Sequence, residues 1–304
     1  MNKPQYFTPV LTAFLPDGNI DPEANIRIWD RLIENGMSGI VIMGSTGEFF
    51  TMNNEQKRQL IMLAGTHLKG RTQFFAGTGN MRMDDTVELS NFAFENGADG
   101  VMIVGPYYFG LSDASVELYF STVADGVRGN IFLYNFPDRT SYDLKPEIAL
   151  KLVKKHSNIV GYKDTVGSMN HTRELITTMR GNGCDEFIIM SGSDTNFAHT
   201  MISGGNGCIG ATSNLYPELC SAWMKALIAE DLAKVSAIQK VMDRVNFAGV
   251  GAFFIPVLKK ALMLRGVEMY DACQFPFISC SEEQTIKIQM VLNELDPQVK
   301  AVIS

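Results

Sequence analysis

The chain has 304 residues, 46% hydrophobic and 19% charged, so one large domain or two ordinary ones with a sizeable core are possible. The net charge is −7 and no basic cluster occurs, which argues against a nucleic-acid-binding surface. No apolar run approaches the roughly 20 residues of a membrane-spanning helix, and the N-terminal segment lacks the apolar core of a signal peptide.

Short apolar strands alternate with amphipathic helices as far as about residue 230. Strands are expected at 6–12, within 34–45, at 72–77, within 95–106, at 130–135, 158–163 and 187–191, and within 203–212. Helices are expected near 22–35, 53–69, 83–96, 113–126, 146–156, 169–180, 194–203 and 217–229. The helix near 53–69 has a clear start signal, with Asn53 or Asn54 as its cap and Glu55 in its first turn.

One pattern recurs three times in these segments. The sequence ENGMSGIVIMGS (34–45) is echoed by ENGADGVMIVGP (95–106) and more loosely by SGGNGCIGAT (203–212). Each copy predicts a helix that ends at a left-handed glycine, followed by a turn and a short, continuously apolar strand. A strand of this kind is typical of a parallel sheet that is covered on both faces.

Eight strand–helix units in this length predict a closed (β/α)8 barrel over residues 1–230. Residues 231–304 are expected to be a helical extension packed on the barrel, with helices near 231–246, 251–265 and 281–297. An open doubly wound sheet is the alternative fold. The glycines Gly205-x-Gly207-x-x-Gly210 match a dinucleotide-binding pattern but precede a strand instead of following one, so we interpret them as turn and strand glycines.

Polar residues gather where the predicted strands end, which is where barrel enzymes carry their chemistry. These ends read Gly44-Ser45-Thr46-Gly47-Glu48, Pro106-Tyr107-Tyr108, Tyr134-Asn135-Phe136-Pro137, Lys163-Asp164-Thr165 and Ser191-Gly192-Ser193-Asp194. If the chain is a barrel, all of them meet at one rim.

Lys163 is the residue in this set with the most distinctive chemistry. A desolvated lysine has a lowered pKa, and its neutral amine can form a Schiff base with a carbonyl compound. Tyr134 is placed to move the protons that imine formation needs, and Ser45 and Thr46 in a glycine-flanked turn are suited to hold a small carboxylate. Each of these residues also has a plainer interpretation. Lys163 would be a solvated loop lysine, Tyr134 a core residue, and Gly44–Gly47 an ordinary turn. Glu48, which follows that turn, would cap a helix or bind backbone N–H groups.

The cysteines and histidines indicate the redox environment of the protein and whether it binds a transition metal. The five cysteines are an odd number without a CxxC pair, which predicts a reduced, cytoplasmic protein. The four histidines form no HxH or HExxH pair, so no transition-metal site is expected.

The same strand ends carry a family resemblance. The motifs GSTGE (44–48), PYY (106–108), YNFPDRT (134–140) and GYKDT (161–165) occur in the order and spacing of the dihydrodipicolinate synthase and N-acetylneuraminate lyase superfamily, which the chain resembles from end to end. The resemblance implies a (β/α)8 barrel with three C-terminal helices, usually a homotetramer. It also implies metal-free class I chemistry with no cofactor other than the covalent lysine–pyruvate imine.

The resemblance assigns roles to individual residues. The catalytic residues would be Lys163 as the imine former, Tyr134 as the proton relay, Ser45, and Tyr108, which the synthases lend across a subunit interface. The substrate-binding residues would be Thr46, Gly47, Arg139, Thr165, Gly192 and Ile209.

The subfamily signals conflict. Arg139 matches the arginine with which the synthases bind the carboxylate of aspartate semialdehyde, and a guanidinium suits an anionic acceptor. Ser45 and Asp164 depart from the synthase pattern, and YNFP with KDT is more similar to aldolases for 2-keto-3-deoxy sugar acids. Asn54 and Lys57 stand where lysine-inhibited synthases have histidines, so feedback inhibition by lysine is not expected.

From the sequence we expect a Schiff-base lyase that acts on pyruvate and an aldehyde, with no nucleic-acid or membrane partner. The interpretation leans to a 4-hydroxy-tetrahydrodipicolinate synthase-like condensation because of Arg139. The alternative is a catabolic aldolase, for a 2-keto-3-deoxy sugar acid or like N-acetylneuraminate lyase, that releases pyruvate. A non-catalytic small-molecule-binding barrel is the remaining alternative, and the presence of both Lys163 and Tyr134 speaks against it.

Overall fold

The computed structural model describes residues 2–304, and its strands form a closed parallel barrel in chain order. The strands are β1 (Gln5–Pro9), β2 (Gly39–Ile42), β3 (Gln73–Gly77), β4 (Gly100–Val104), β5 (Ile131–Asn135), β6 (Ile159–Asp164), β7 (Ile188–Ser191) and β8 (Gly207–Ile209). Every expected strand is present. The predicted (β/α)8 barrel is therefore confirmed, and the open-sheet alternative is excluded.

Helices separate the strands as expected. They are α1 (Pro22–Glu34), α2 (Asn54–Leu68), α3 (Met83–Glu95), α4 (Asp113–Gly126), α6 (Pro146–Lys155), α7 (Met169–Gly181), α8 (Phe197–Ile202) and α9 (Pro217–Ile228). The N-cap of α2 is Asn53, which forms a capping box with Gln56. The short helix α5 (Pro137–Thr140) was not expected from the sequence.

The helix predicted over 194–203 needs a correction. Its first turn is the 3₁₀ helix η2 (Asp194–Asn196), and α8 begins only at Phe197. The described residues form three other 3₁₀ turns: η1 (Ser45–Gly47), η3 (Ala211–Asn214) and η4 (Ala248–Val250). Such turns are frequent at helix ends and as connectors, and they carry no periodic apolar pattern that a sequence could reveal.

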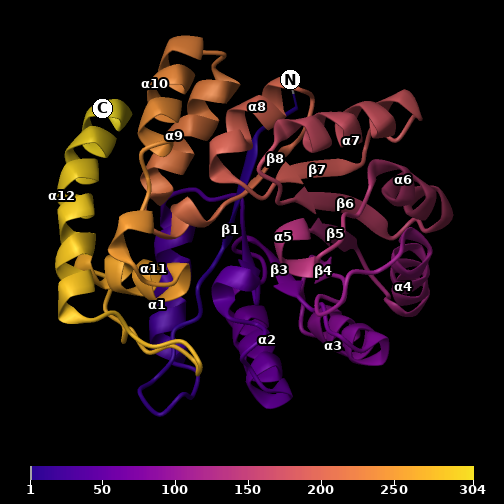
Figure 1. The fold of residues 1–304 in the computed structure, drawn as a ribbon, viewed down its shortest axis with the longest axis horizontal. Helices are drawn as coiled ribbons and strands as arrows, with labels where there is room; N and C mark the ends of the chain where they lie inside the picture. The colour runs from indigo at the N-terminus through magenta and orange to yellow at the C-terminus, as the bar shows by residue number, and fades with distance from the viewer. Residues whose placement is uncertain (1) are drawn as a thin grey trace. The chain divides into compact units, whose positions relative to one another are not determined.

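Three helices follow α9: α10 (Leu232–Met242), α11 (Phe254–Leu264) and α12 (Glu282–Ile303). Helix α12, drawn in yellow in Figure 1, packs beside α10 and α11. Within residues 2–304, no helix combines the length and the apolar character needed to cross a membrane. The boundary between a barrel and an extension near residue 230 stays a prediction.

The chain divides into two compact units. The first, which we call the central unit, is Gln73–Gly210 together with the N-terminal residues through Gln5; the second, the terminal unit, is Tyr6–Thr72 with Ala211–Ser304. In the central unit, β3 to β8 pair in parallel as successive neighbours, with α3, α4, α6 and α7 following them. In the terminal unit, β1 pairs with β2.

The strands are short and continuously apolar because both of their faces are covered. Every residue of β4 and β5 is buried, as a parallel barrel strand requires. The helices before β2 and β4 are followed by Gly36 and Gly97 with φ of 77° and 89°. These values confirm the left-handed glycine turns that the repeated pattern predicts.

Strand β1 ends earlier than expected, at Pro9 instead of residue 12. Beyond it, side-chain amides take over the backbone hydrogen bonds that a strand partner would make. Asn214 Oδ1 accepts from the Leu11 N–H, and Asn25 Oδ1 accepts from the Ala13 N–H. Buried backbone groups need partners of some kind, and here they come from distant side chains that an apolar run does not reveal.

Candidate active site

Lys163 and Tyr134 are neighbours at the carboxyl ends of β6 and β5. The two residues are register partners in the parallel pairing of these strands. Lys163 Nζ lies 4.2 Å from the centroid of the Tyr134 ring, and each residue is only 4% exposed. The lysine is therefore withdrawn from bulk water and packed on an aromatic face.

An aromatic layer lies beneath this pair. Phe132 and Gly161, the register partners two residues earlier on the same face, pack directly on each other. A Cβ atom on Gly161 would lie 2.3 Å from the Phe132 ring, so only glycine fits there. Phe75 packs against the same ring at a centroid distance of 4.8 Å. The Gly161 of the GYKDT motif thus makes room for the Phe132 ring beneath Lys163 and Tyr134.

Thr165 and Gly192 continue the site beyond the strand ends. The Gly192 N–H donates to the Asp164 carbonyl at 2.7 Å, and a Cβ on Gly192 would lie 1.8 Å from Thr165 Oγ1. The Thr165 hydroxyl oxygen is buried and has no hydrogen-bond partner within residues 2–304. Ile209, the last residue of β8, is fully buried. The central unit therefore holds Lys163, Tyr134, Thr165 and Gly192 on adjoining strand ends.

Arg139 lies on α5, outside the Tyr134 ring. Its guanidinium carbon is 5.5 Å from the centroid of the Phe136 ring, and that ring stacks on Tyr134 at 5.9 Å with an interplanar angle of 25°. The arginine side chain is exposed and has no carboxylate partner within the described residues 2–304. Two rings thus separate the Lys163 amine from the Arg139 charge.

Tyr108 lies beyond β4 and is 76% exposed, stacked edge-on against Phe109. The role across a subunit interface that the resemblance implies for Tyr108 stays a prediction.

The terminal unit carries the GSTGE motif as the 3₁₀ turn η1. The Gly47 N–H donates to the Gly44 carbonyl at 3.0 Å, and Thr12 Oγ1 donates to the Gly47 carbonyl at 2.9 Å. A Cβ on Gly47 would lie 2.9 Å from the Val10 carbonyl oxygen, so the turn packs closely on the segment after β1. Thr46 is 8% exposed, and Ser45 is half-buried.

Glu48, which ends this motif, does not cap α2, because Asn53 does. Its fully buried carboxylate forms an ion pair with the fully buried Lys259 of α11 and accepts a hydrogen bond from the Gln274 N–H at 2.9 Å. Lys259 Nζ also donates to the Ala272 carbonyl at 2.7 Å. Glu48 thus binds a backbone N–H, as one interpretation of the sequence expected. Its ion pair with Lys259 was not predicted from the sequence.

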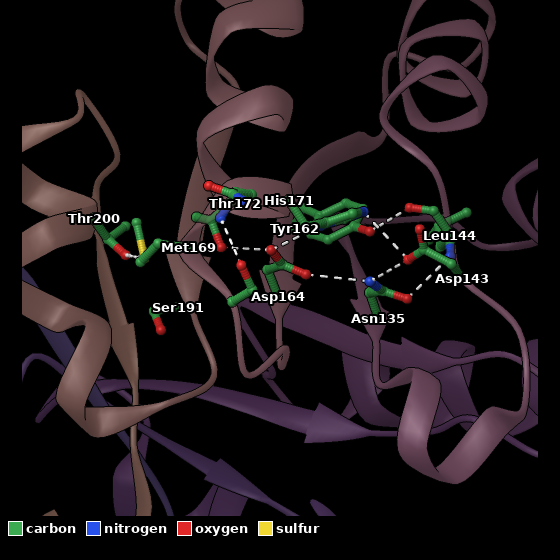
Figure 2. Close-up of polar contacts among 12 residues, drawn as sticks. Asn135, Asp143, Leu144, Tyr162, Asp164, Met169, His171, Thr172, Ser191 and Thr200 are labelled. Atoms are coloured by element: carbon green, nitrogen blue, oxygen red, sulfur yellow. Dashed lines mark hydrogen bonds and ion pairs between the residues drawn. The ribbon is translucent and has the colours of Figure 1, made fainter.

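A second polar cluster lies behind the Lys163–Tyr134 pair. Asn135, Asp143, Asp164 and His171 contact one another on the helix side of β5 and β6 (Figure 2). Burial alone would lower the pKa of His171, but its contacts with Asp143 and Asp164 outweigh burial and raise that pKa to about 10. Sequence reasoning missed this cluster. The available signal was Asp164 itself, because a carboxylate next to a buried strand lysine needs partners of its own.

The fold and the family match define the class of protein as a lyase, a pyruvate-dependent enzyme of the class I aldolase and synthase type. The chain belongs to the Dihydrodipicolinate synthetase family, whose model matches residues 3–295. The expected superfamily is therefore confirmed.

Relatives of both substrate types are similar to this chain. It is 32% identical to the putative 2-dehydro-3-deoxy-D-gluconate aldolase YagE of Escherichia coli, over 94% of this chain and 95% of the relative. It is 34% identical to a 4-hydroxy-tetrahydrodipicolinate synthase of Agrobacterium fabrum, over 76% and 77% of the two chains. A crystal structure of YagE in complex with pyruvate superposes with a TM-score of 0.93, at 32% identity, covering 96% of this chain and 98% of that one.

Proposed function

We propose that the protein is a Schiff-base lyase in which the Lys163 amine forms an imine with pyruvate. The observation that carries this proposal is the environment of the amine, which is buried on the Tyr134 ring and has no ion-pair partner within residues 2–304. The buried Lys259, by contrast, is paired with Glu48. An unpaired buried amine costs stability, and a carbonyl-directed nucleophile is the use for which such a group is suited.

The chemistry follows from the positions of these groups. The Lys163 amine adds to the 2-oxo carbon, water leaves, and a protonated imine forms. The imine withdraws electrons from the adjacent carbon, so a carbon–carbon bond there breaks to release an aldehyde, or forms when the enamine attacks one. Tyr134, in contact with the lysine, supplies and removes the protons of these steps. For the pyruvate carboxylate we propose Ser45 and Thr46, on the family resemblance of the GSTGE motif alone.

We propose a 2-keto-3-deoxy sugar acid as the substrate that is cleaved. This departs from the synthase interpretation favoured by the sequence, for two reasons. Two relatives that align over more than nine-tenths of both chains, at 32% and 33% identity, are named as aldolases for such acids, whereas a synthase that aligns over 95% of both chains is 28% identical. In addition, the buried Thr165 hydroxyl oxygen has no hydrogen-bond partner among residues 2–304, and a hydroxylated substrate would provide one.

A synthase that condenses pyruvate with aspartate semialdehyde is the second candidate, and Arg139 favours it. Its exposed guanidinium pairs with no carboxylate in the described part of the chain, residues 2–304, so it is available to an acidic acceptor. We further propose a cytoplasmic homotetramer in which a partner subunit covers the exposed Tyr108. The five free cysteines accord with a reducing compartment.

Two experiments test the proposal. Purified protein treated with pyruvate and borohydride should gain a reduced pyruvyl group on the peptide that contains Lys163, and a Lys163→Ala variant should gain none. Pyruvate release from 2-keto-3-deoxy-gluconate should then be measured against condensation with aspartate semialdehyde. Full labelling of the Lys163→Ala variant would overturn the imine assignment, and activity with the semialdehyde alone would reverse the choice of substrate.

A further inference from the structure

Four polar side chains form a closed ring behind the proposed reactive pair. Asn135 Nδ2 donates to Asp143 Oδ1 at 2.8 Å and to Asp164 Oδ1 at 3.2 Å. His171 Nδ1 lies 2.9 Å from Asp164 Oδ2, and His171 Nε2 lies 3.2 Å from Asp143 Oδ1. Figure 2 shows the ring, with His171 and Asn135 each bridging the two carboxylates.

The ring lies on the opposite side of the strands from the reactive pair. Successive strand residues point to opposite faces, so Asp164 and Asn135 point to the helix side where Lys163 and Tyr134 point to the barrel interior. The pairing register joins Tyr134 with Lys163 and, one residue on, Asn135 with Asp164. The hydrogen bond between Asn135 and Asp164 therefore fixes the same register that brings the lysine onto the tyrosine ring.

The ring also ties these strand ends to two further segments. Thr172, the neighbour of His171 at the start of α7, donates to Asp164 Oδ2 at 2.6 Å. In the segment between α5 and α6, the Leu144 N–H donates to Asn135 Oδ1 at 3.0 Å, and its carbonyl accepts from the Tyr162 hydroxyl. Asp164 is fully buried, so its charge depends on these partners.

The arrangement requires a charged histidine. Both ring nitrogens of His171 face carboxylate oxygens, which only accept hydrogen bonds when ionised, and a neutral imidazole carries one N–H instead of two. The contact of Nε2 with Asp143 has the distance of an ion pair but not the alignment of a hydrogen bond, so it is mainly the positive charge that acts on that side. The pKa of His171, raised to about 10, agrees with this geometry.

We infer that His171 is a positioning residue for the proposed reaction: as a charged bridge between Asp143 and Asp164, it holds the carboxyl ends of β5 and β6 so that Lys163 stays against the Tyr134 ring. The inference rests on the proposed imine chemistry at Lys163. It assigns His171 no contact with substrate and no proton transfer. Its contribution is geometric, and displacing a reacting group by about 1 Å can cost on the order of 10²-fold in rate.

The test compares three histidine variants. His171→Gln keeps one hydrogen-bond donor but removes the charge, and His171→Arg keeps the charge with several donors. His156→Gln is the matched control, because His156 is another little-exposed histidine of the central unit with a hydroxyl and a carboxylate as neighbours, Ser121 at 2.8 Å and Asp125 at 3.4 Å. Each variant is assayed for kcat, KM and the rate of borohydride trapping with pyruvate, well below its unfolding midpoint.

His171→Gln should lower kcat and the trapping rate by roughly 10- to 100-fold with a smaller change in KM, because the amine is misplaced while the binding groups remain. His171→Arg should recover most of the loss, and His156→Gln should keep the kcat of the unmodified protein. If His171→Gln does not fold, Asp143→Asn, which weakens the same bridge, should show a smaller loss of kcat in the same direction.

Three results would overturn the inference. They are an unchanged kcat in His171→Gln, equal losses in the His171→Gln and His156→Gln variants, and no recovery of kcat in His171→Arg. If His171→Gln cannot be assayed, an unchanged kcat in Asp143→Asn decides against it instead. Failure of the proposed function can be distinguished from failure of this inference. If the imine chemistry is wrong, pyruvate and borohydride will not label the protein with its natural sequence, regardless of the kinetics of the variants.

Discussion

Lys163 Nζ lies 4.2 Å from the centroid of the Tyr134 ring, and the pairing of β5 with β6 places the two residues side by side. Their contact is the centre of the proposed chemistry, because the amine is desolvated by the ring whose hydroxyl is assigned the proton transfers. The predictions below separate this pair from the residues that support it.

Replacing Tyr134 with Phe should lower kcat by about 10²-fold or more, the usual scale of a positioned acid–base group, while KM changes little. The ring, and with it the packing against Lys163, stays in place. Steady-state kinetics measure the effect. Tyr119→Phe is the control: this tyrosine is also buried and bonded through its hydroxyl, to Thr86 and the Asn80 carbonyl, and its loss should leave kcat unchanged. A rise in KM alone for Tyr134→Phe would contradict the relay role.

Replacing Arg139 with Ala separates the two candidate substrates. A charge-assisted contact contributes about 1.5–3 kcal/mol, so the KM for aspartate semialdehyde should rise roughly ten- to over a hundredfold if Arg139 binds an acidic acceptor. The KM for pyruvate should hardly change, because two rings lie between Arg139 and the lysine. Arg128→Ala, at the other end of β5 and also exposed, is the matched control. Equal effects of the two substitutions would leave Arg139 without a role in recognition.

The buried pair of Glu48 and Lys259 should dominate the stability of the GSTGE turn. Lys259→Met leaves a buried carboxylate without its cation, which typically costs about 3–5 kcal/mol in the free energy of unfolding. The double variant Glu48→Gln, Lys259→Met should recover part of that loss because no charge remains unpaired. Urea unfolding measures the free energy of unfolding of the single and the double variant. Lys287→Met, which breaks the exposed pair with Glu283, should change stability far less, because water and salt screen that pair.

The charged state of His171 predicts a loss of stability in alkali. Its pKa is about 10 in the folded protein against an ordinary value of 6.5, so the folded state holds the proton more tightly than the unfolded chain. The stabilisation is therefore complete below pH 6.5 and is lost as the pH rises through about 10, with a slope approaching about 1.4 kcal/mol per pH unit in between. The titratable groups that face the His171 imidazole are Asp143, Asp164 and Tyr162, whose ring centroid lies 6.4 Å from that of the imidazole.

Urea unfolding at several pH values checks this dependence. The stability difference between the unmodified protein and His171→Gln should be constant below pH 6.5 and should shrink as the pH rises from 6.5 to about 10. His171→Arg should show no such trend, because arginine keeps its charge throughout this range. A constant difference across the whole range would mean that His171 is not charged in the folded protein.

Much of the fold was readable from the sequence because the features that produce it are local. Continuous apolar runs between glycine turns identify strands that are covered on both faces, and their alternation with amphipathic helices leads to a parallel barrel. The position of Lys163 at a strand end follows from the same local pattern. Where local patterns are weak, the prediction was wrong: β1 ends at Pro9, and the first turn of the helix predicted from 194 is η2.

The partners of the buried charges were decided only by the tertiary structure. Glu48 accepts from the backbone of Gln274, 226 residues away along the chain, and His171 on α7 meets Asp143, which lies in the segment between α5 and α6. No periodicity encodes such pairs, since they depend on where distant segments come together once the core has packed. The sequence thus determined which strand ends carry chemical groups. Packing and register decided that Lys163 lies on the Tyr134 ring while Asp164, one residue on, is buried in a ring of polar contacts on the opposite face.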